Sequence, residues 1–267
     1  MGIINATPDS FSDGAQLHKS GASTFHLDVS KALSRAELMV NEGATFIDVG
    51  GESTRPGAAI VPEREELDRV IPLIEAIHSR LDVCISIDTS SPVVMMEAIK
   101  AGAEFINDVR ALSASGAMEA AAASKAAVCL MHMRGNPSTM QDELSYESVV
   151  DEVLAFLAER IERCLAASIT QDRLLIDPGF GFGKSVAHNY QLLKNLAQFS
   201  VLNVPLLVGV SRKSMIGDVV LRPVDQRLAG TITATAFALS AGAKIIRAHD
   251  VAATMDAIRV NSAYSSA

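Results

Sequence analysis

Short apolar runs alternate with longer segments of helical periodicity along the whole chain, and no linker, repeat or low-complexity stretch interrupts them. Such runs are typical of buried parallel strands, whereas apolar positions three and four apart are typical of helices that cover a sheet. The pattern predicts strands at residues 2–6, 45–50, 83–88, 104–108, 127–132, 173–177, 205–210 and 244–248. It predicts helices at residues 29–41, 63–81, 92–101, 116–124, 146–167, 189–199, 225–241 and 251–263.

This alternation favours an α/β fold with a closed parallel sheet, a (β/α)8 TIM barrel, formed by residues 1–267 as a single domain. The 267 residues, 49% of them hydrophobic, suffice for one large core and lie within the usual range for this fold. A doubly wound open sheet is the alternative that the same alternation permits.

The charge and composition of the chain restrict which classes of ligand and which cellular compartment we expect. A net charge of -8 without any Lys/Arg run disfavours nucleic acid, so a local basic cluster must meet any anionic ligand. No apolar run approaches the roughly 20 residues of a membrane span, and no signal-peptide core follows Met1. Cys84, Cys129 and Cys164 lack zinc-site spacing and the even count of a disulfide framework. Cys84 and Cys129 lie in apolar strand-like runs, which predicts that these two are reduced packing residues. We therefore expect a cytoplasmic protein that does not bind a membrane.

Each apolar run ends at or just before a polar residue, and the eight are Asn5, Asp48, Asp88, Asn107, His132, Asp177, Ser211 and Arg247. In a (β/α)8 barrel the carboxyl ends of the strands converge on the active site, so these side chains are expected to line one mouth. The alternative is that they cap the following turn or helix, as Asn, Asp and Ser often do.

Two long loops rich in Gly, Ser and Pro follow the first two strands. Loops of more than about 12 residues in a compact domain are typical of lids, and Phe11 in the first loop favours closure over a ligand; docking on the rim is the alternative. The second loop carries Gly50 and Gly51, which permit a close backbone approach, and then hydroxyl and guanidinium donors up to Arg55, which suit an anion. A turn with a solvated arginine is the other interpretation.

Asp88, Asn107 and Asp177 each close a predicted strand. A carboxylate accepts two parallel N–H bonds, so this trio suits a planar heterocycle with an amidine-like edge, as in guanine and pterins. A general acid/base couple and a Mg²⁺ site remain alternatives. The glycines that follow Asp177 simply alternate and do not form a nucleotide-binding P-loop.

Basic groups follow the last two predicted strands, where this fold usually binds phosphate. Lys213 and Arg247 come directly after buried runs, where an unpaired charge is costly. His132 and His249 are candidates for a general base, and His132 is equally interpreted as a rim histidine held by its neighbours.

The motifs N-A-T-P-D-S-F-S-D-G, G-G-E-S-T-R-P-G, S-I-D-T, I-N-D, L-M-H-M, D-P-G-F-G-F-G-K, S-R-K-S and R-A-H-D stand in this order in the chain. With them the chain resembles the dihydropteroate synthases over nearly its whole length. The resemblance implies a (β/α)8 barrel. It also implies condensation of 6-hydroxymethyl-7,8-dihydropterin pyrophosphate with 4-aminobenzoate, with sulfonamides as competitive inhibitors and a homodimer as the assembly.

Residue by residue, the resemblance implies a pterin site of Asp88, Asn107, Met131, Asp177, Phe182, Gly209, Lys213 and Arg247. It implies an aminobenzoate site of Phe11, Thr54, Arg55, Pro56, Lys213 and Ser214. Pyrophosphate would be bound by Asn5, Arg247 and His249, with Mg²⁺ at Asn5 as cofactor. The catalytic residues would be Asp88, Lys213, Arg247 and His249.

The mechanism implied by the resemblance is dissociative, with pyrophosphate leaving before the arylamine attacks. Two departures from the family pattern concern the first strand, which the chain enters without the usual preceding residues, and the stretch after Gly14, which is longer and has Ala15 in place of a second glycine. A pterin-dependent methyltransferase and a non-catalytic pterin-binding barrel are the alternative functions.

Overall fold

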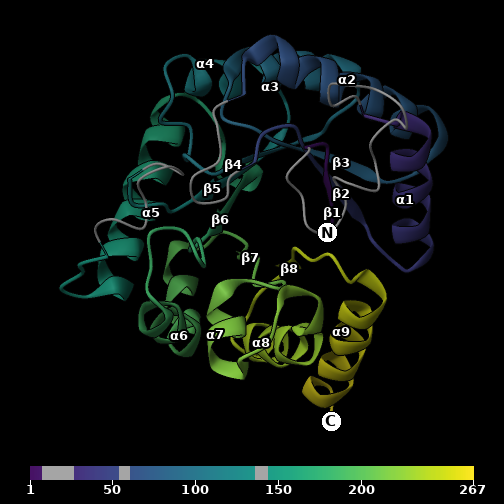
Figure 1. The fold of residues 1–267 in the computed structure, drawn as a ribbon. Helices are drawn as coiled ribbons and strands as arrows, with labels where there is room; N and C mark the ends of the chain where they lie inside the picture. The colour runs from purple at the N-terminus through teal and green to yellow at the C-terminus, as the bar shows by residue number, and fades with distance from the viewer. Residues whose placement is uncertain (8–26, 54–60, 136–143) are drawn as a thin grey trace.

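Eight parallel strands succeed one another in chain order around the centre of the molecule (Figure 1). The computed structural model describes residues 1–7, 27–53, 61–135 and 144–267. The strands are β1 Gly2–Asn5, β2 Phe46–Gly50, β3 Cys84–Asp88, β4 Phe105–Asp108, β5 Ala127–Met131, β6 Leu174–Asp177, β7 Leu207–Val208 and β8 Ile245–Ile246.

The pairing of the strands closes the sheet into a barrel. Strands β1 to β6 form one ladder in sequential order, and β7 pairs with β8. Single parallel bridges complete the circle, Ile176 with Leu206 between β6 and β7, and Gly2 with Ala248 between β8 and β1. A doubly wound sheet would reverse its strand order at a switch point, so the (β/α)8 prediction is confirmed and the open-sheet alternative is excluded.

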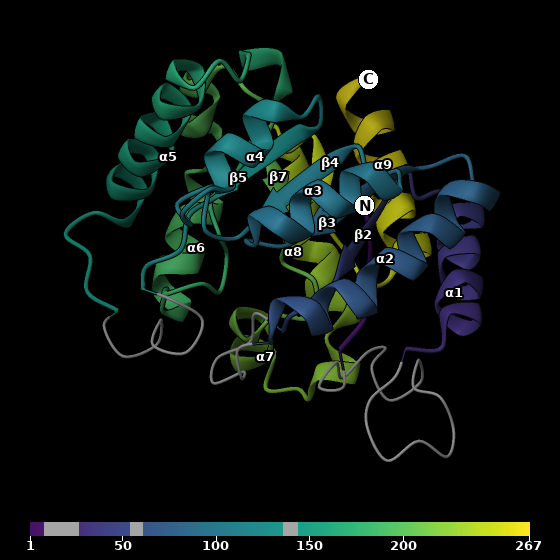
Figure 2. The ribbon, with the colours of Figure 1, turned by 90° about the horizontal axis from the view of Figure 1, so that it is seen from above.

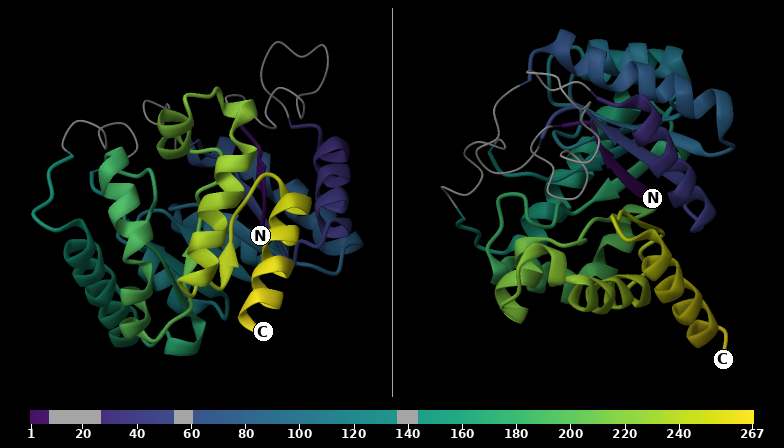
Figure 3. Two further views of the ribbon diagram at one scale, coloured as in Figure 1. Left: turned by 90° about the horizontal axis from the view of Figure 1, so that it is seen from below. Right: turned by 45° about the vertical axis from the view of Figure 1, so that its right-hand side comes forward.

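Helices surround the barrel on all sides (Figures 1 and 2). They are α1 Val29–Asn41, α2 Glu63–Arg80, α3 Pro92–Ala101, α4 Ala117–Ala123, α5 Val149–Ala166, α6 Val186–Lys194, α7 Ser214–Val220, α8 Leu228–Ser240 and α9 Val251–Ser265. Local signals start several of them: the Asp28 side chain caps α1, and Ser91 caps α3 ahead of Pro92. Helices α8 and α9 lie side by side, as the left view of Figure 3 shows.

Three predicted elements differ from the structure after β6. The predicted helix 189–199 begins earlier, as α6, and continues as a separate 3₁₀ segment, Leu196–Leu202, after a break at Asn195. The predicted strands 205–210 and 244–248 form ladders of only two residues each. Helix α7 was not predicted, because its seven residues include Gly217 and three β-branched residues, which have low helix propensity.

Alternate residues of each strand point into the barrel and form layers. The lower layer is apolar and contains the buried Phe105, Cys129, Leu175 and Leu207, with Phe46, Cys84 and Ile245 packed against them. The inward positions two residues further along the same strands are Asp48, Ser86, Asn107, Met131, Asp177, Gly209 and Arg247. The apolar layer therefore closes the barrel beneath a largely polar one.

The three cysteines are free, which confirms the prediction for Cys84 and Cys129. Burial raises the pKa of Cys84 and that of Cys164 to about 11, and it raises the pKa of Cys129 well above its usual value. They are protonated packing residues at neutral pH. Among the described residues, no helix combines the length and apolarity that crossing a membrane requires.

Candidate active site

Arg247, just after β8, joins carboxylates from β2 and β3 in the polar layer. Its Nε donates to Asp48 Oδ2 at 2.6 Å, and its Nη2 donates to Asp88 Oδ2 at 2.7 Å. The Asp48 side chain is fully buried, and that of Arg247 is 20% exposed. Burial alone would lower the pKa of Arg247, but Asp48 and Asp88 outweigh it and raise that pKa. The guanidinium is therefore permanently charged and locked in orientation by two charge-assisted bonds.

Asp88 shares this guanidinium with a second carboxylate. Burial raises the pKa of Asp88 to about 7, the nearby carboxylate of Asp48 adds to the rise, and Arg247 opposes it. One cation cannot fully compensate two buried carboxylates, so the raised pKa of Asp88 has a clear physical cause.

Asp48 was expected among the polar residues that line the mouth, but it was assigned to none of the predicted binding sites. Its Oδ1 accepts from Ser86 Oγ at 2.5 Å, and its Oδ2 accepts from Asn107 Nδ2 at 3.2 Å besides Arg247. The signal that could have found it is strand alternation, because Asp48 stands between Phe46 and Gly50 on the inward face of β2. A carboxylate inside a barrel must have a cation or several donors as partners.

Asp177 and Lys213 stand near the Arg247 cluster. Asp177 is 5% exposed, and its Oδ1 accepts from the Gly179 amide at 2.7 Å. Burial raises the pKa of Asp177, while Lys213, the Gly179 amide and Lys184 oppose the rise. Lys213 donates from Nζ to the carbonyl of Phe180 and lies 4.6 Å from the Phe182 ring centroid. Burial lowers the pKa of Lys213 to about 8, and Asp177 opposes that decrease.

Gly209 lies between Arg247 and Asp177 and presents no side chain to either of them. A Cβ there would lie 3.8 Å from Arg247 Cβ and 4.0 Å from Asp177 Oδ2. Met131 is paired with Asp177 in the β5–β6 register. The structure thus brings the eight predicted pterin residues to the strand ends and the adjoining loops of one mouth.

The predicted anion residues lie on the neighbouring strands β8 and β1. The Nδ1 atom of His249 lies 2.9 Å from Ser211 Oγ, which also accepts from the His249 amide at 3.2 Å. Ser211 thus fixes the orientation of the imidazole. Asn5 ends β1 and is paired with Gly50. In the part of the chain that the structure describes, no three or more His, Cys, Asp or Glu side chains form a metal-binding group.

The predicted aminobenzoate residues are only partly described. Ser214 begins α7 directly after Lys213, so the two share one edge of the mouth. Phe11, Thr54, Arg55 and Pro56 lie outside the described residues.

His132 is turned away from the mouth. Its Nδ1 lies 2.9 Å from Lys184 Nζ, and its ring packs edge-on against Phe156 of α5 at 5.0 Å. Burial, aided by the charge of Lys184, lowers the pKa of His132 to about 2. It is therefore a buried neutral histidine, which supports the rim interpretation and not that of a general base.

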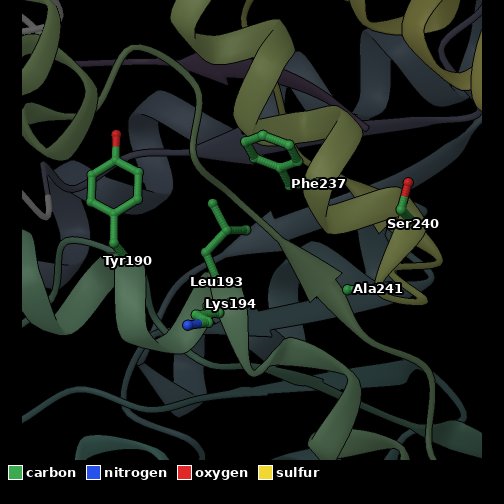
Figure 4. Close-up of a pocket in the computed structure, with 6 residues that line it drawn as sticks. All are labelled: Tyr190, Leu193, Lys194, Phe237, Ser240 and Ala241. Atoms are coloured by element: carbon green, nitrogen blue, oxygen red, sulfur yellow. The ribbon is translucent and has the colours of Figure 1, made fainter.

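A groove of about 550 Å³ lies on the outside of the barrel between α6 and α8. Tyr190, Leu193 and Lys194 come from α6, and Phe237, Ser240 and Ala241 come from the end of α8 (Figure 4). It contains none of the charged groups of the mouth and is remote from the strand ends.

Comparison with known proteins identifies the family that this geometry belongs to. Residues 1–249 match the family model described as "Pterin binding enzyme". The chain is 53% identical to a dihydropteroate synthase of Escherichia coli (strain K12), over 100% of this chain and 92% of the relative. A Yersinia pestis dihydropteroate synthase solved with a sulfonamide drug complex superposes with a TM-score of 0.94 at 49% identity, covering 100% of this chain and 94% of that one. A Xanthomonas albilineans dihydropteroate synthase solved with 4-aminobenzoic acid superposes with a TM-score of 0.90 at 47% identity, covering 100% and 92%.

Replacing Asp88 with asparagine is expected to flatten the pH dependence of the free energy of unfolding. The raised pKa of Asp88 means that the folded state binds more protons than the unfolded state between about pH 4 and pH 7. The contribution of Asp88 to the free energy of unfolding is therefore fully present below this window and is lost as the pH rises through it. Asparagine still accepts from Arg247 but does not titrate. Between about pH 4.5 and pH 8 the free energy of unfolding should therefore fall by on the order of 2 kcal/mol less in Asp88→Asn than in the wild type.

Urea unfolding at several pH values measures this difference. Asp82→Asn, at an exposed carboxylate ahead of β3, is the matched control and should follow the wild-type profile. Parallel profiles for Asp88→Asn and the wild type would show that Asp88 does not titrate in this window.

Proposed function

The chain belongs to the pterin-binding enzymes and, within that family, to the dihydropteroate synthases, and from this membership we propose how its residues perform the reaction. The reaction joins 6-hydroxymethyl-7,8-dihydropterin pyrophosphate to 4-aminobenzoate and releases pyrophosphate. The observation that carries the residue assignment is the cluster of Asp88, Asn107, Asp177, Lys213 and Arg247 at one mouth of the barrel.

The pterin lies beside Gly209. Asp177 is already held by the Gly179 amide through Oδ1, so its carboxylate is oriented before a ligand arrives. It accepts parallel N–H bonds from the amino-pyrimidine edge, and Asn107 supplies the mixed donor and acceptor that the same ring requires. Lys213 donates to the pterin carbonyl and ring nitrogen, and Arg247 covers a ring face. Met131 and Phe182 line its binding site.

Pyrophosphate binds where β1 and β8 adjoin, between Asn5 and the pair Arg247 and His249. The Asn5 side chain offers Mg²⁺ a single oxygen ligand, which fits an ion that keeps waters and binds mainly through substrate phosphates. When bound, Mg²⁺ would neutralise charge on the pyrophosphate. Ser211 holds the His249 ring in place to contact the same group.

4-Aminobenzoate binds at the edge formed by Lys213 and Ser214, together with Phe11, Thr54, Arg55 and Pro56. The Yersinia pestis and Xanthomonas albilineans relatives, solved with a sulfonamide complex and with 4-aminobenzoic acid, support this ligand class for the chain. Sulfonamides resemble the arylamine and would compete for the same edge.

The chemistry is a dissociative substitution at the pterin methylene carbon. The carbon–oxygen bond breaks, and its electron pair leaves with pyrophosphate, which Arg247 and His249 stabilise. The positive charge that develops on the pterin is favoured by the carboxylate of Asp88. The arylamine nitrogen then forms the new bond to carbon and releases one proton. The reaction needs no activated nucleophile. This agrees with the state of His132, which is neutral and turned away from the mouth.

The sequence left two alternative functions, a pterin-dependent methyltransferase and a non-catalytic pterin-binding barrel, and the full-length similarity to dihydropteroate synthases decides against both. Neither requires the anion pocket or the Lys213–Ser214 edge. The wild type mixed with the pterin pyrophosphate, 4-aminobenzoate and Mg²⁺ should release pyrophosphate only when the arylamine is present. Asp177→Asn, which replaces one acceptor by a donor, should lose about tenfold or more in kcat/KM for the pterin substrate. Binding of the pterin without pyrophosphate release would support the binding barrel.

Asn5→Ala is expected to separate the pyrophosphate site from the pterin site. Removing the amide oxygen should weaken binding of the pyrophosphate-bearing pterin in the presence of Mg²⁺ by about tenfold, a loss in the range of one charge-assisted interaction. Binding of 6-hydroxymethyl-7,8-dihydropterin, which has no pyrophosphate, should not change. Parallel calorimetric titrations of both ligands measure this contrast, and equal weakening would place Asn5 at the pterin ring.

The assembly is a homodimer in this proposal, and its interface is the outer face of α6, α7 and α8. This face includes the groove of Figure 4 and exposes large apolar side chains, with Leu221 at 87% and Phe237 at 59% exposure. Apolar patches of this kind on a folded protein mark interfaces. A second copy suits it, because a two-fold axis lets the same patch cover itself.

Phe237→Asp is expected to convert the dimer into a monomer with an intact fold. A charge in a desolvated apolar interface costs several kcal/mol, enough to raise the dimer dissociation constant by about a thousandfold. Sedimentation velocity of the wild type and the variant gives the masses. Val260→Asp, at an exposed position on α9, is the control and should remain dimeric. A monomeric wild type would contradict the proposal.

A further inference from the structure

Lys184 is a buried lysine to which the residue assignments above give no role. It closes the segment that runs from Asp177 through three glycines, and it is only 3% exposed. Its Nζ atom donates to the carbonyl oxygens of Gly179 at 2.9 Å, Phe182 at 3.0 Å and His132 at 3.3 Å. The same Nζ lies 2.9 Å from His132 Nδ1, and burial lowers the pKa of Lys184 well below its usual value, while the carboxylate of Asp177 opposes that decrease. Three carbonyl oxygens around one nitrogen favour the protonated amine, because it carries three N–H groups and a positive charge that their dipoles stabilise. The side chain is therefore a caged ammonium, which is unlike the usual solvated lysine.

The cage is built from the turn that carries the pterin-site residues. Gly179 accepts from Lys184 through its carbonyl, while its amide donates to Asp177 Oδ1 at 2.7 Å. Phe180, the next residue, offers its carbonyl to Lys213, and Phe182 places its ring against the same ammonium. The carbonyls of one short turn are thus divided between two lysines.

The turn has little room to adopt another shape. Gly179 has a φ of +71°, and a Cβ there would lie 1.8 Å from the carbonyl oxygen of His132. On the far side, the Gly181 amide donates to Asn189 Oδ1 at 2.7 Å. A backbone this close to β5 places several carbonyl oxygens near one another, and such dipoles repel unless a cation stands among them.

We propose that Lys184 is a positioning residue of the pterin site, whose ammonium gathers the carbonyls of the turn after β6 and so holds Asp177 and Lys213 in register with the ligand. The inference rests on the proposed function, because it gives Lys184 its role through the assigned pterin residues. It differs from a purely structural role, since the ammonium also acts electrostatically on the carboxylate that binds the ligand.

The charges around Asp177 give this electrostatic effect a direction. Burial raises the pKa of Asp177, and the cations that face it are Lys213 after β7, Lys184 after β6 and Arg247 after β8. Removing one of the three lets the pKa of Asp177 rise further, so a smaller fraction of the carboxyl is ionised at a given pH. Pterin binding through the ionised carboxylate then weakens most at low pH and recovers as the pH rises.

Two variants at position 184 separate these effects from simple unfolding. Lys184→Met keeps a long unbranched side chain but removes the donors and the charge, whereas Lys184→Gln keeps two N–H donors without charge. Lys125→Met, at an exposed lysine ahead of β5, is the matched control. Calorimetric titration with 6-hydroxymethyl-7,8-dihydropterin at about pH 6 and pH 8 gives the affinities, and thermal denaturation shows which variants are folded.

We expect Lys184→Met to bind the pterin at least tenfold more weakly than the wild type, and Lys184→Gln to bind it at least threefold more weakly. Both losses should be larger at pH 6 than at pH 8, and the control should match the wild type. Wild-type affinity at both pH values in either folded variant overturns the inference, even where the melting temperature has fallen. If Lys184→Met does not fold, Lys184→Gln decides alone. A wild type that binds no pterin overturns the pterin assignment itself and this inference with it.

Discussion

The structure depends on one buried charge arrangement, the Arg247 guanidinium held between Asp48 and Asp88. The arginine follows the last strand and the carboxylates lie on the second and third, and Arg247 and Asp48 are 199 positions apart in the sequence. They can meet only when the barrel is closed, because closure brings β8 beside β1 and the inward faces of β2 and β3 within reach. Removing one partner would leave an uncompensated charge inside the protein. The closed barrel and the polar mouth are therefore mutually dependent.

A polar mouth of this kind is tolerable because the apolar layer lies directly beneath it. Phe105, Cys129, Leu175 and Leu207 fill the lower barrel, and the layer two positions later on the strands includes the polar residues Asn107 and Asp177. Because strand side chains alternate, the residues that stabilise the barrel and the residues that carry the polar groups form two separate, adjacent layers. This layering also explains why the polar groups have depressed or raised pKa values, since their lower side contacts hydrocarbon and not water.

Much of this arrangement could be predicted from the sequence, and the failures have identifiable causes. The order of the strands and the polar residues at their ends follow from periodicity, and the residues at Asp88, Asn107 and Asp177 do meet at one mouth. Periodicity does not reveal partners distant in sequence, so Asp48 was noted as a strand end but not as the centre of a network. No role was predicted for Lys184, because the sequence does not show which carbonyl oxygens a turn will bring together. Helix α7 lies below the length at which a periodic pattern can be recognised, whereas the last two strands were predicted but form ladders of only two residues.

Arg247, Lys184 and Lys213 are not interchangeable cations, and their surroundings explain why. Arg247 must reach two carboxylates on different strands at once, and only the planar guanidinium presents Nε and Nη2 in fixed, diverging directions. Lys184 stands among carbonyls on several sides, which suits the three tetrahedrally arranged donors of an ammonium. Lys213 has a single carbonyl and a ring as partners beside Asp177, so it is the cation least committed to the protein itself. Of the three, Lys213 can exchange a backbone partner for a ligand at the smallest cost, whereas Arg247 and Lys184 hold the frame in which that exchange takes place.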